Sequence, residues 1–308
     1  VNGGNALEEG QDKKTVTYNQ KYGALPTPTR DGFAFGGWYV EDLDDDASVE
    51  GKTLITSETI VSITGPQTLY AYWTVNNYNL TVIYKYADQE KPAAETLVVS
   101  MTYGAEITEA TLQIQEIEGY SHAYVVDGGI SLPTTMPVGG LTVTVTYTPN
   151  EHKIILVPNY PDSASASEPE NVEIPTVYNQ NIAITTIKTL GWTVAGYTFQ
   201  GWKAADGQTY ADGYTFAPWN IDADLALEAQ WQANTDTTFT VNIHMMGTDG
   251  EYDVVETPMT GTTDSKIVFT SNETTLTINE TPYTYPGMTF NSELSTSITT
   301  EIYISGNG

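Results

Sequence analysis

The sequence predicts a mainly β protein made of four small modules arranged end to end. Apolar and polar residues alternate in several stretches, for example over residues 141–147, where Leu, Val and Tyr alternate with Thr. This period of two is typical of a half-buried strand. An aromatic and glycine-rich motif occurs twice, and a stretch of similar length follows each copy. The length of 308 residues also exceeds the usual size of one domain and predicts more than one core.

The duplicated motif defines the first and third modules. Both copies follow the pattern Gly-[Phe/Tyr]-x-Phe-x-Gly-Trp, and matching segments lie before and after them in the same order. The matched segments are residues 32–38 and 196–202, 69–73 and 227–231, and 18–20 and 178–180. An acidic insertion, Glu41–Asp46, lengthens the first copy, and a surface loop accommodates such an insertion at little cost. A duplication is the simplest explanation.

Short polar segments separate the modules, which we place at residues 1–75, 76–150, 151–233 and 234–308. The second and fourth modules each begin with a strand rich in Thr and Val and end with a Thr-rich one. That similarity is weak and does not decide whether the two modules are related.

Strands are expected throughout, with one short helix in each of the second and fourth modules. Three further segments alternate in the same way as residues 141–147, namely 80–86, 225–231 and 239–245. The best helical segment is 106–118, where Ile107, Ala110, Leu112 and Ile114 could share one face. The β-branched residues within this segment weaken the prediction.

Composition excludes several classes of protein. Eleven Lys and Arg against thirty-nine Asp and Glu give a net charge of −28, which repels nucleic acids and anionic membrane surfaces. The chain has no cysteine, which excludes disulfides, thiolate metal sites and thiol nucleophiles. No apolar run approaches the ~18 residues of a membrane-spanning helix. The two ends lack signal or anchor features, so such signals are absent or the chain is an excised piece.

The first module resembles the internalin-B-type, or Listeria–Bacteroides, repeat of Gram-positive surface proteins. The resemblance rests on residues 2–4, 22–23, 28–39 and 69–73, which carry an Asn-Gly-Gly start, a Tyr-Gly, the aromatic core motif and a closing Leu-Tyr-Ala-x-Trp. The third module, residues 151–233, departs from the pattern at 159–161, 194–195 and Lys203.

Residues 78–149 resemble a mucin-binding-protein (MucBP) module through segments 82–88, 118–120 and 143–147. Together the two resemblances imply ubiquitin-like β-grasp folds in the tandem repeats of an exported, cell-wall-associated protein. They also imply that residues 1–4 are the tail of a first strand lost to trimming.

Tryptophans are the first candidates for a binding site. Trp38, Trp73, Trp202 and Trp231 occupy matched positions in the two copies, and we interpret them as core residues. Trp192 and Trp219 lie outside the motif beside turn residues. Exposed indoles of this kind can stack on a sugar, but for both residues we favour packing in the core of their own module or between modules.

Metal binding and catalysis find little support, and we expect no cofactor. Asp42, Asp44 and Asp46 alternate like calcium ligands, but an EF-hand loop would need Gly at 47 and Glu at 53, where Ala and Thr stand. A solvated acidic loop is therefore favoured. The three histidines lie in different modules and no catalytic motif occurs, so we do not expect an enzyme. Lys14, Lys85, Lys153 and Lys266 are candidates for an intramolecular isopeptide bond, which needs a buried Lys beside an Asn or Asp.

The sequence thus predicts an extracellular repeat segment of a Gram-positive surface adhesin, monomeric and part of a longer chain. It acts as a stalk, as a module that binds a host or matrix glycan or protein, or as both. The alternative is the carbohydrate-binding region of a secreted polysaccharide-active enzyme. The sequence does not name a ligand.

Overall fold

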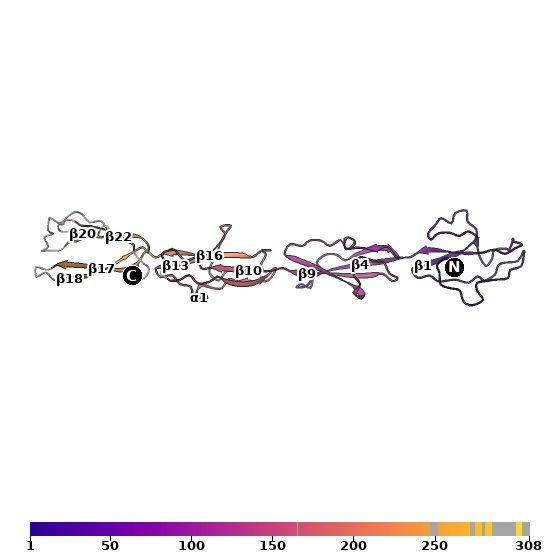
Figure 1. Ribbon diagram of the computed structural model, residues 1–308, viewed down its shortest axis with the longest axis horizontal. Coiled ribbons are helices and arrows are strands. Elements are labelled where there is room, and N and C mark those ends of the chain that lie inside the picture. The colour runs from indigo at the N-terminus through magenta and orange to yellow at the C-terminus, as the bar shows by residue number, and fades with distance from the viewer. Residues whose placement is uncertain (165, 247–251, 272–274, 279–280, 285–299, 304–308) are drawn as a thin grey trace. The chain divides into compact units, whose positions relative to one another are not determined.

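The computed structural model of the chain divides into two compact units, residues 1–149 and 150–308 (Figure 1). It describes the chain except residues 165, 247–251, 272–274, 279–280, 285–299 and 304–308. The unit boundary lies one residue from the sequence boundary between the second and third modules. The described residues form small β-sheets with only short helices, so the predicted mainly β class is confirmed.

The first 75 residues form a three-stranded sheet of order β2-β1-β3, in which β1 pairs antiparallel with both neighbours. Its strands are β1 (Phe33–Tyr39), β2 (Leu54–Ile55) and β3 (Tyr70–Val75). The pairing of β1 with β3 shifts by one residue between Phe35 and Gly37. Gly37 has a φ of 126°, a backbone conformation that suits glycine, so this bulge explains the glycine before the motif's tryptophan.

Residues 76–149 form a four-stranded sheet of order β5-β4-β9-β7, in which the central strands β4 and β9 are parallel. The strands are β4 (Asn77–Tyr86), β5 (Leu97–Thr102), β7 (Tyr120–Val126) and β9 (Leu141–Pro149), with β6 (Glu106–Ile107) and β8 (Thr134–Thr135) forming a small second sheet. In β9 the four apolar residues of the alternating segment 141–147 are buried, as the period of two predicts.

The helix predicted over residues 106–118 is wrong in extent. Only one 3-10 turn forms, η1 (Glu109–Leu112), and a second 3-10 turn, η2 (Asp127–Gly129), follows β7. The side chain of Thr111 accepts a hydrogen bond from the Thr108 backbone at 3.1 Å, and Gln113 ends the turn with a φ of 49°. The threonine side chains thus bond the local backbone instead of supporting a longer helix.

Residues 150–233 form a five-stranded sheet of order β11-β10-β16-β13-β14, in which β10 and β16 are parallel. The strands are β10 (Glu151–Val157), β11 (Val172–Val177), β13 (Tyr197–Ala204), β14 (Thr209–Tyr210) and β16 (Leu225–Ala233). The pair β12 (Ile182–Ala183) and β15 (Thr215–Phe216) and the helix α1 (Ile187–Leu190) complete this module.

The two copies of the motif share three strands and one bulge. β13, β14 and β16 correspond to β1, β2 and β3, and β13 repeats the register shift between Phe199 and Gly201. Gly201 also repeats the φ of 126°. Strands β10 and β11 have no counterpart within residues 1–75, all of which the structure describes.

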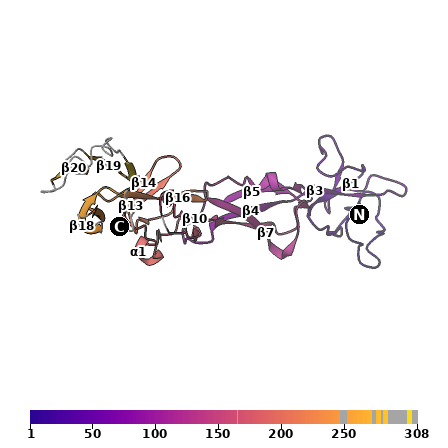
Figure 2. The same ribbon diagram turned by 60° about the vertical axis from the view of Figure 1, so that its left-hand side comes forward.

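The last module contains a hairpin of β17 (Thr237–Met246) and β18 (Tyr252–Gly261). A four-stranded sheet of order β21-β20-β19-β22 follows. Its strands are β19 (Lys266–Ser271), β20 (Thr275–Ile278), β21 (Thr281–Thr284) and β22 (Thr300–Tyr303), and Figure 2 gives a second view of these elements.

Candidate functional site

The motif's aromatic residues form the two cores. In the first copy Phe35 packs edge-on between Trp38 and Trp73, with both ring-centroid distances at 5.6 Å. In the second copy Phe199 lies between Trp202, at 5.1 Å, and Trp231, at 5.5 Å. Trp38, Trp73 and Trp202 are buried and Trp231 is partly buried. Their indole rings therefore serve packing.

The two candidate sugar-stacking residues also lie in a core. Trp219 is 0% exposed and packs on Phe216 with ring centroids 4.8 Å apart. Trp192 is 7% exposed and packs edge-on against Trp202 at 6.0 Å. Neither ring presents a free face to solvent, so the geometry supports a core role for both.

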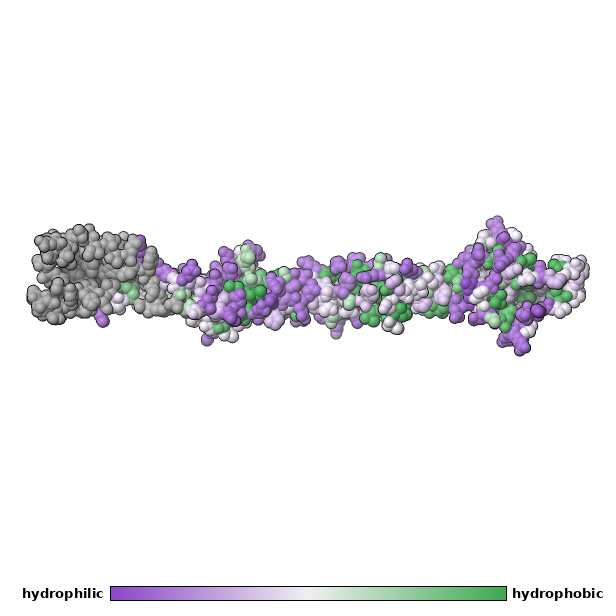
Figure 3. Space-filling view, in the orientation of Figure 1, coloured by the Kyte–Doolittle hydropathy of each residue, from purple (hydrophilic) through white to green (hydrophobic). Residues whose placement is uncertain are grey.

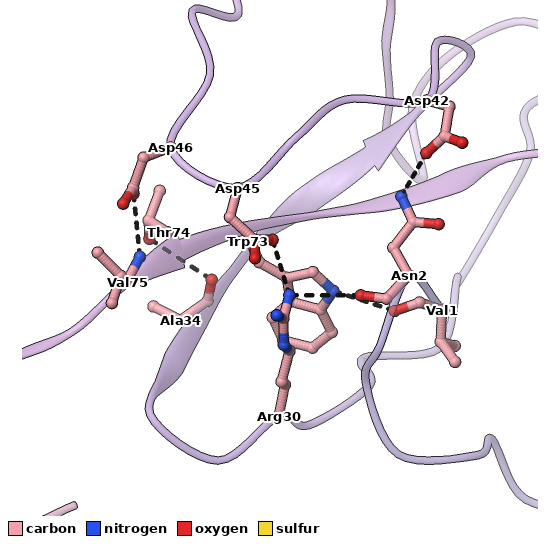
Figure 4. Close-up of polar contacts among 10 residues, drawn as sticks. All are labelled: Val1, Asn2, Arg30, Ala34, Asp42, Asp45, Asp46, Trp73, Thr74 and Val75. Carbon is pink, nitrogen blue, oxygen red and sulfur yellow. Dashed lines mark hydrogen bonds and ion pairs between the residues drawn. The ribbon is translucent and has the colours of Figure 1, made fainter. Parts of the chain in front are cut away.

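The acidic loop, residues 41–46, packs on the chain through separate hydrogen bonds (Figure 4). Asp42 Oδ1 accepts from Asn2 Nδ2 at 2.7 Å, Asp45 pairs with Arg30 at 2.7 Å, and Asp46 Oδ1 accepts from the Val75 backbone at 2.9 Å. These three aspartates are exposed, and each carboxylate has its own partner on the chain instead of converging with the others on one point. The described residues contain no group of three or more His, Asp or Glu side chains able to hold a metal ion.

Among the histidines whose side chains the structure describes, His152 on β10 is the more closely paired with an acid. Its Nε2 lies 2.8 Å from Asp222 Oδ1, and its Nδ1 lies 3.8 Å from Asp224 Oδ1. Asn150 Nδ2 donates to the same Asp222 oxygen at 2.8 Å. The shallow surface depression beside His152 is lined by Glu151, Lys153, Glu173, Pro175 and Asp224, none of which is a Ser, Thr or Cys nucleophile. The pair holds β10 to the loop before β16.

The four candidate isopeptide lysines lie at or near the surface. Lys14, Lys85 and Lys266 are exposed, and Lys153 is half-buried. Lys14 Nζ donates to the Ala24 carbonyl at 2.5 Å. Lys153 Nζ lies 2.7 Å from Glu173, and this hydrogen bond raises the lysine pKa. An isopeptide bond needs a buried, neutral lysine beside an amide or acid, and none of these four side chains meets that requirement.

A cavity of about 460 Å³ lies within residues 1–75. Trp38, Tyr22 and Leu25 are among the residues that line it, together with segments around 11–16 and 65–69. The Tyr22 hydroxyl donates to Gln67 Oε1 at 2.5 Å at its border. No sequence pattern predicts this cavity, because its walls come from segments about fifty residues apart.

In both units the same set of backbone hydrogen bonds connects the motif module to the following module, and we call this set the joint. In the first unit the Asn76 amide donates to Gly32 at 2.9 Å, and Asn76 accepts from the Tyr103 amide at 2.9 Å. In the second unit the Asn234 amide donates to Gly196 at 2.8 Å, and Asn234 accepts from the Thr263 amide at 2.9 Å. Each joint therefore ties the motif's first glycine to the hairpin of the next module.

Side chains reinforce each joint differently. The Phe33 ring packs edge-on against Tyr103 with centroids 5.8 Å apart, and the Arg30 guanidinium lies 3.7 Å above the Phe33 ring. In the second unit the Tyr197 hydroxyl donates to Asp264, which also accepts from Ser163 Oγ at 2.5 Å. Burial, and then the bond to Asp264, raise the pKa of Tyr197. Aromatic side-chain contacts therefore reinforce the first joint, and side-chain hydrogen bonds reinforce the second.

The fourth module begins as the second module does. Tyr103 and Thr263 occupy the same place in the two joints, and each is followed by a residue with positive φ, Gly104 at 78° and Asp264 at 62°. In both modules the asparagine of the joint lies shortly before the first strand of the pair, β4 or β17. The residue whose amide bonds it lies shortly after the second strand, β5 or β18. This agreement favours a common origin for the two modules, a question that the sequence left open.

Comparison with known proteins places the repeat type. Residues 1–72 and 206–246 match the Listeria–Bacteroides repeat domain. The first match covers nearly all of the first module, as the motif predicts. The second begins after the aromatic motif at 196–202 and extends into the fourth module, so it covers only part of the predicted repeat at 151–233.

A relative from Evansella cellulosilytica, named "Putative membrane protein", is 25% identical over 245 residues. The alignment covers 76% of this chain and 32% of the relative, so the chain spans about a third of that protein's length. Listeria–Bacteroides repeats are typical of extracellular surface proteins, which is the setting that the match supports. Among the described residues, no helix is both long and apolar enough to span a bilayer.

Proposed function

We propose that this chain is a spacer segment of a bacterial surface adhesin: non-enzymatic, extracellular and attached to the cell wall. The recurrence of the joint carries the proposal. Two motif modules of different sequence use the same glycine and asparagine backbone bonds to hold the module that follows. A flexible linker would not need these bonds, whereas a segment that must keep a set geometry between neighbouring modules would.

The placement of aromatic residues supports spacing over ligand binding. Trp192 and Trp219 are buried, as are Trp38, Trp73 and Trp202. Sugar-binding surfaces instead expose aromatic faces beside polar groups. On the face that Figure 3 shows, apolar residues lie interspersed with hydrophilic ones over the described residues. A mucin, matrix or glycan partner would have to bind such a mixed surface.

The joint is tested by measuring how firmly it fixes its two modules. Because the chain has no cysteine, spin labels can be attached at Glu50→Cys and Glu95→Cys, two exposed positions on either side of the first joint. Pulsed electron paramagnetic resonance should give one narrow distance distribution. Gly32→Ala should broaden it, since an added Cβ would collide with the Tyr103 ring.

Gly104→Ala is the matched control. Gly104 has a φ of 78°, close to the 80° of Gly32, but an added Cβ there meets nothing within 4 Å. Both variants thus strain the backbone equally, and only Gly32→Ala disturbs the joint. A broad distribution in the parent chain would refute the spacer proposal. Specific binding of the chain to mucin or to a glycan array would contradict spacing as its sole role.

A further inference from the structure

Aspartate is followed directly by glycine at four places among the residues that the structure describes: 31–32, 127–128, 206–207 and 212–213. This dipeptide is chemically reactive, because glycine has no side chain to hinder the attack of its own backbone nitrogen on the preceding carboxyl group. The product of the reaction is isoaspartate, in which the side-chain carbons have entered the main chain. The surroundings of each aspartate decide whether its carboxyl group is available.

Both pairs in the second unit are held by hydrogen bonds. Asp206 Oδ1 accepts from the Gln208 amide at 2.8 Å, and the Gly207 amide, which would be the attacking group, donates to a backbone carbonyl at 2.9 Å. Asp212 Oδ1 accepts from the Ile187 amide at 2.8 Å. In each pair a hydrogen bond to a charged group would have to break before the carboxyl could react.

Both pairs in the first unit have an available carboxyl group. Asp31 and Asp127 are exposed, and neither side chain makes a hydrogen bond or an ion pair with a residue that the structure describes. No side-chain bond to those residues therefore has to break before either carboxyl group turns toward the next backbone amide.

Only the first of these two pairs lies at a joint. The Gly32 carbonyl accepts from the Asn76 amide at 2.9 Å, and a Cβ added to Gly32 would lie 2.3 Å from the Tyr103 ring. The other pair begins the turn η2, where residues 127–129 are all exposed. A change in the main chain would therefore alter the joint at the first pair but not at the second.

We propose that Asp31 is a site of spontaneous isomerisation and that isoaspartate at this position releases the first joint. The Gly32 nitrogen attacks the side-chain carbon of the protonated Asp31 carboxyl group, and the carboxyl hydroxyl leaves with the amide proton as water. The product is a cyclic imide. Water then adds to the main-chain carbonyl carbon of residue 31 and breaks its bond to the Gly32 nitrogen, which takes up the proton. One water leaves and one enters, so water is the sole co-reactant.

The rearrangement lengthens the turn that presents Gly32 to its partners. The Phe33 amide closes this turn by donating to the Arg30 carbonyl at 3.1 Å, and the Phe33 ring packs on Tyr103. An extra main-chain carbon before Gly32 moves its carbonyl away from the Asn76 amide and disturbs the fit against the Tyr103 ring. The inference concerns a change in the joint with time, and it does not depend on the spacer proposal.

The test stores the full chain in water enriched in oxygen-18 at physiological temperature. Each cycle of imide formation and hydrolysis leaves one heavy oxygen in a carboxylate, and electron-transfer dissociation of the digested chain assigns the label and identifies isoaspartate. Label should enter residues 31 and 127 at least about tenfold faster than residues 206 and 212, the factor that one hydrogen bond to a charged group represents.

Hydrogen exchange of the stored chain reports the state of the joint. The Asn76 amide should exchange at least about tenfold faster in the fraction that carries isoaspartate at residue 31, because it loses the Gly32 carbonyl as its partner. The Asn234 amide of the second joint should keep its exchange rate.

Two variants serve as matched controls. Asp31→Glu keeps an exposed carboxylate but must close a larger ring, so the Asn76 amide should stay protected during storage. Asp127→Glu removes the reactive pair that lies away from the joint, so Asn76 should lose protection as fast as in the parent chain. Label uptake at residue 31 no faster than at residue 206 would overturn the proposal. So would isoaspartate at residue 31 without faster exchange of Asn76, or equal loss of protection in Asp31→Glu and the parent chain.

Discussion

At the residue scale, the glycine before the tryptophan of the second motif is required by a close approach to the backbone of Tyr210. Gly201 has a φ of 126°, and a Cβ added there would lie 2.8 Å from the Tyr210 carbonyl oxygen. We expect Gly201→Ala to cost about 3 kcal/mol of unfolding free energy, from backbone strain and the collision together. Denaturant unfolding followed by tryptophan fluorescence measures this loss.

Gly207→Ala separates the two contributions. Gly207 has a φ of 89° and open space around it, so only backbone strain remains, at about 1 kcal/mol. Equal losses for the two variants would show that the close approach to Tyr210 is unimportant.

Two buried tyrosines hold the second module together through their hydroxyl groups. The Tyr147 hydroxyl donates to the Gln115 carbonyl at 2.7 Å, and that of Tyr84 donates to the Leu112 carbonyl. Tyr147→Phe should lower the unfolding free energy by about 1 kcal/mol, since the carbonyl loses its partner. Tyr18→Phe, at a residue 62% exposed, serves as the control and should have almost no effect. An unchanged denaturation midpoint for Tyr147→Phe would contradict this role.

The same burial predicts unfolding in alkali. Desolvation raises the pKa of Tyr84 and Tyr147 above the ordinary value of 10.0. Below that pH both residues are neutral in the folded and the unfolded chain, so stability is unaffected. Above it, the unfolded chain releases these protons first, so stability falls as pH rises. Phenolate absorbance and circular dichroism should therefore change together, and phenolate formation without unfolding would contradict the prediction.

At the element scale, strands could be predicted where one local pattern decides the outcome. The period of two in residues 141–147 identifies a half-buried strand, and the repeated motif identifies β1 and β13. The helix over 106–118 could not be excluded from spacing alone, because its end depends on the Thr108–Thr111 hydrogen bond and on Gln113. The joints and the cavity of the first module bring together segments distant in sequence, which no local pattern reveals.

The burial of Trp219 shows the same limit at a single position of the core. The turn residues around it left an exposed position open beside the favoured packing role. In the structure it lies where the first copy has Val61, as the equivalent turn bonds show. Its fully buried indole is larger than a valine side chain and packs on Phe216. Trp219→Val should therefore cost about 3–5 kcal/mol, the range of large-to-small core substitutions. A variant of unchanged stability would mean that the indole is dispensable to the core.

At the scale of the whole molecule, charge repulsion opposes folding. Eleven basic residues can neutralise at most eleven of the thirty-nine acidic ones, so a charge of −28 remains. Salt screens repulsion between surface charges, with a Debye length of about 10 Å at 0.1 M and about 3 Å at 1 M. The thermal midpoint should therefore rise by a few degrees between low salt and molar sodium chloride.

Contacts with a basic partner should instead weaken over the same range of salt, because they rely on the charge that salt screens. Measuring both in one titration separates the two effects, and a midpoint that falls with salt would show that ion pairs within the fold outweigh repulsion.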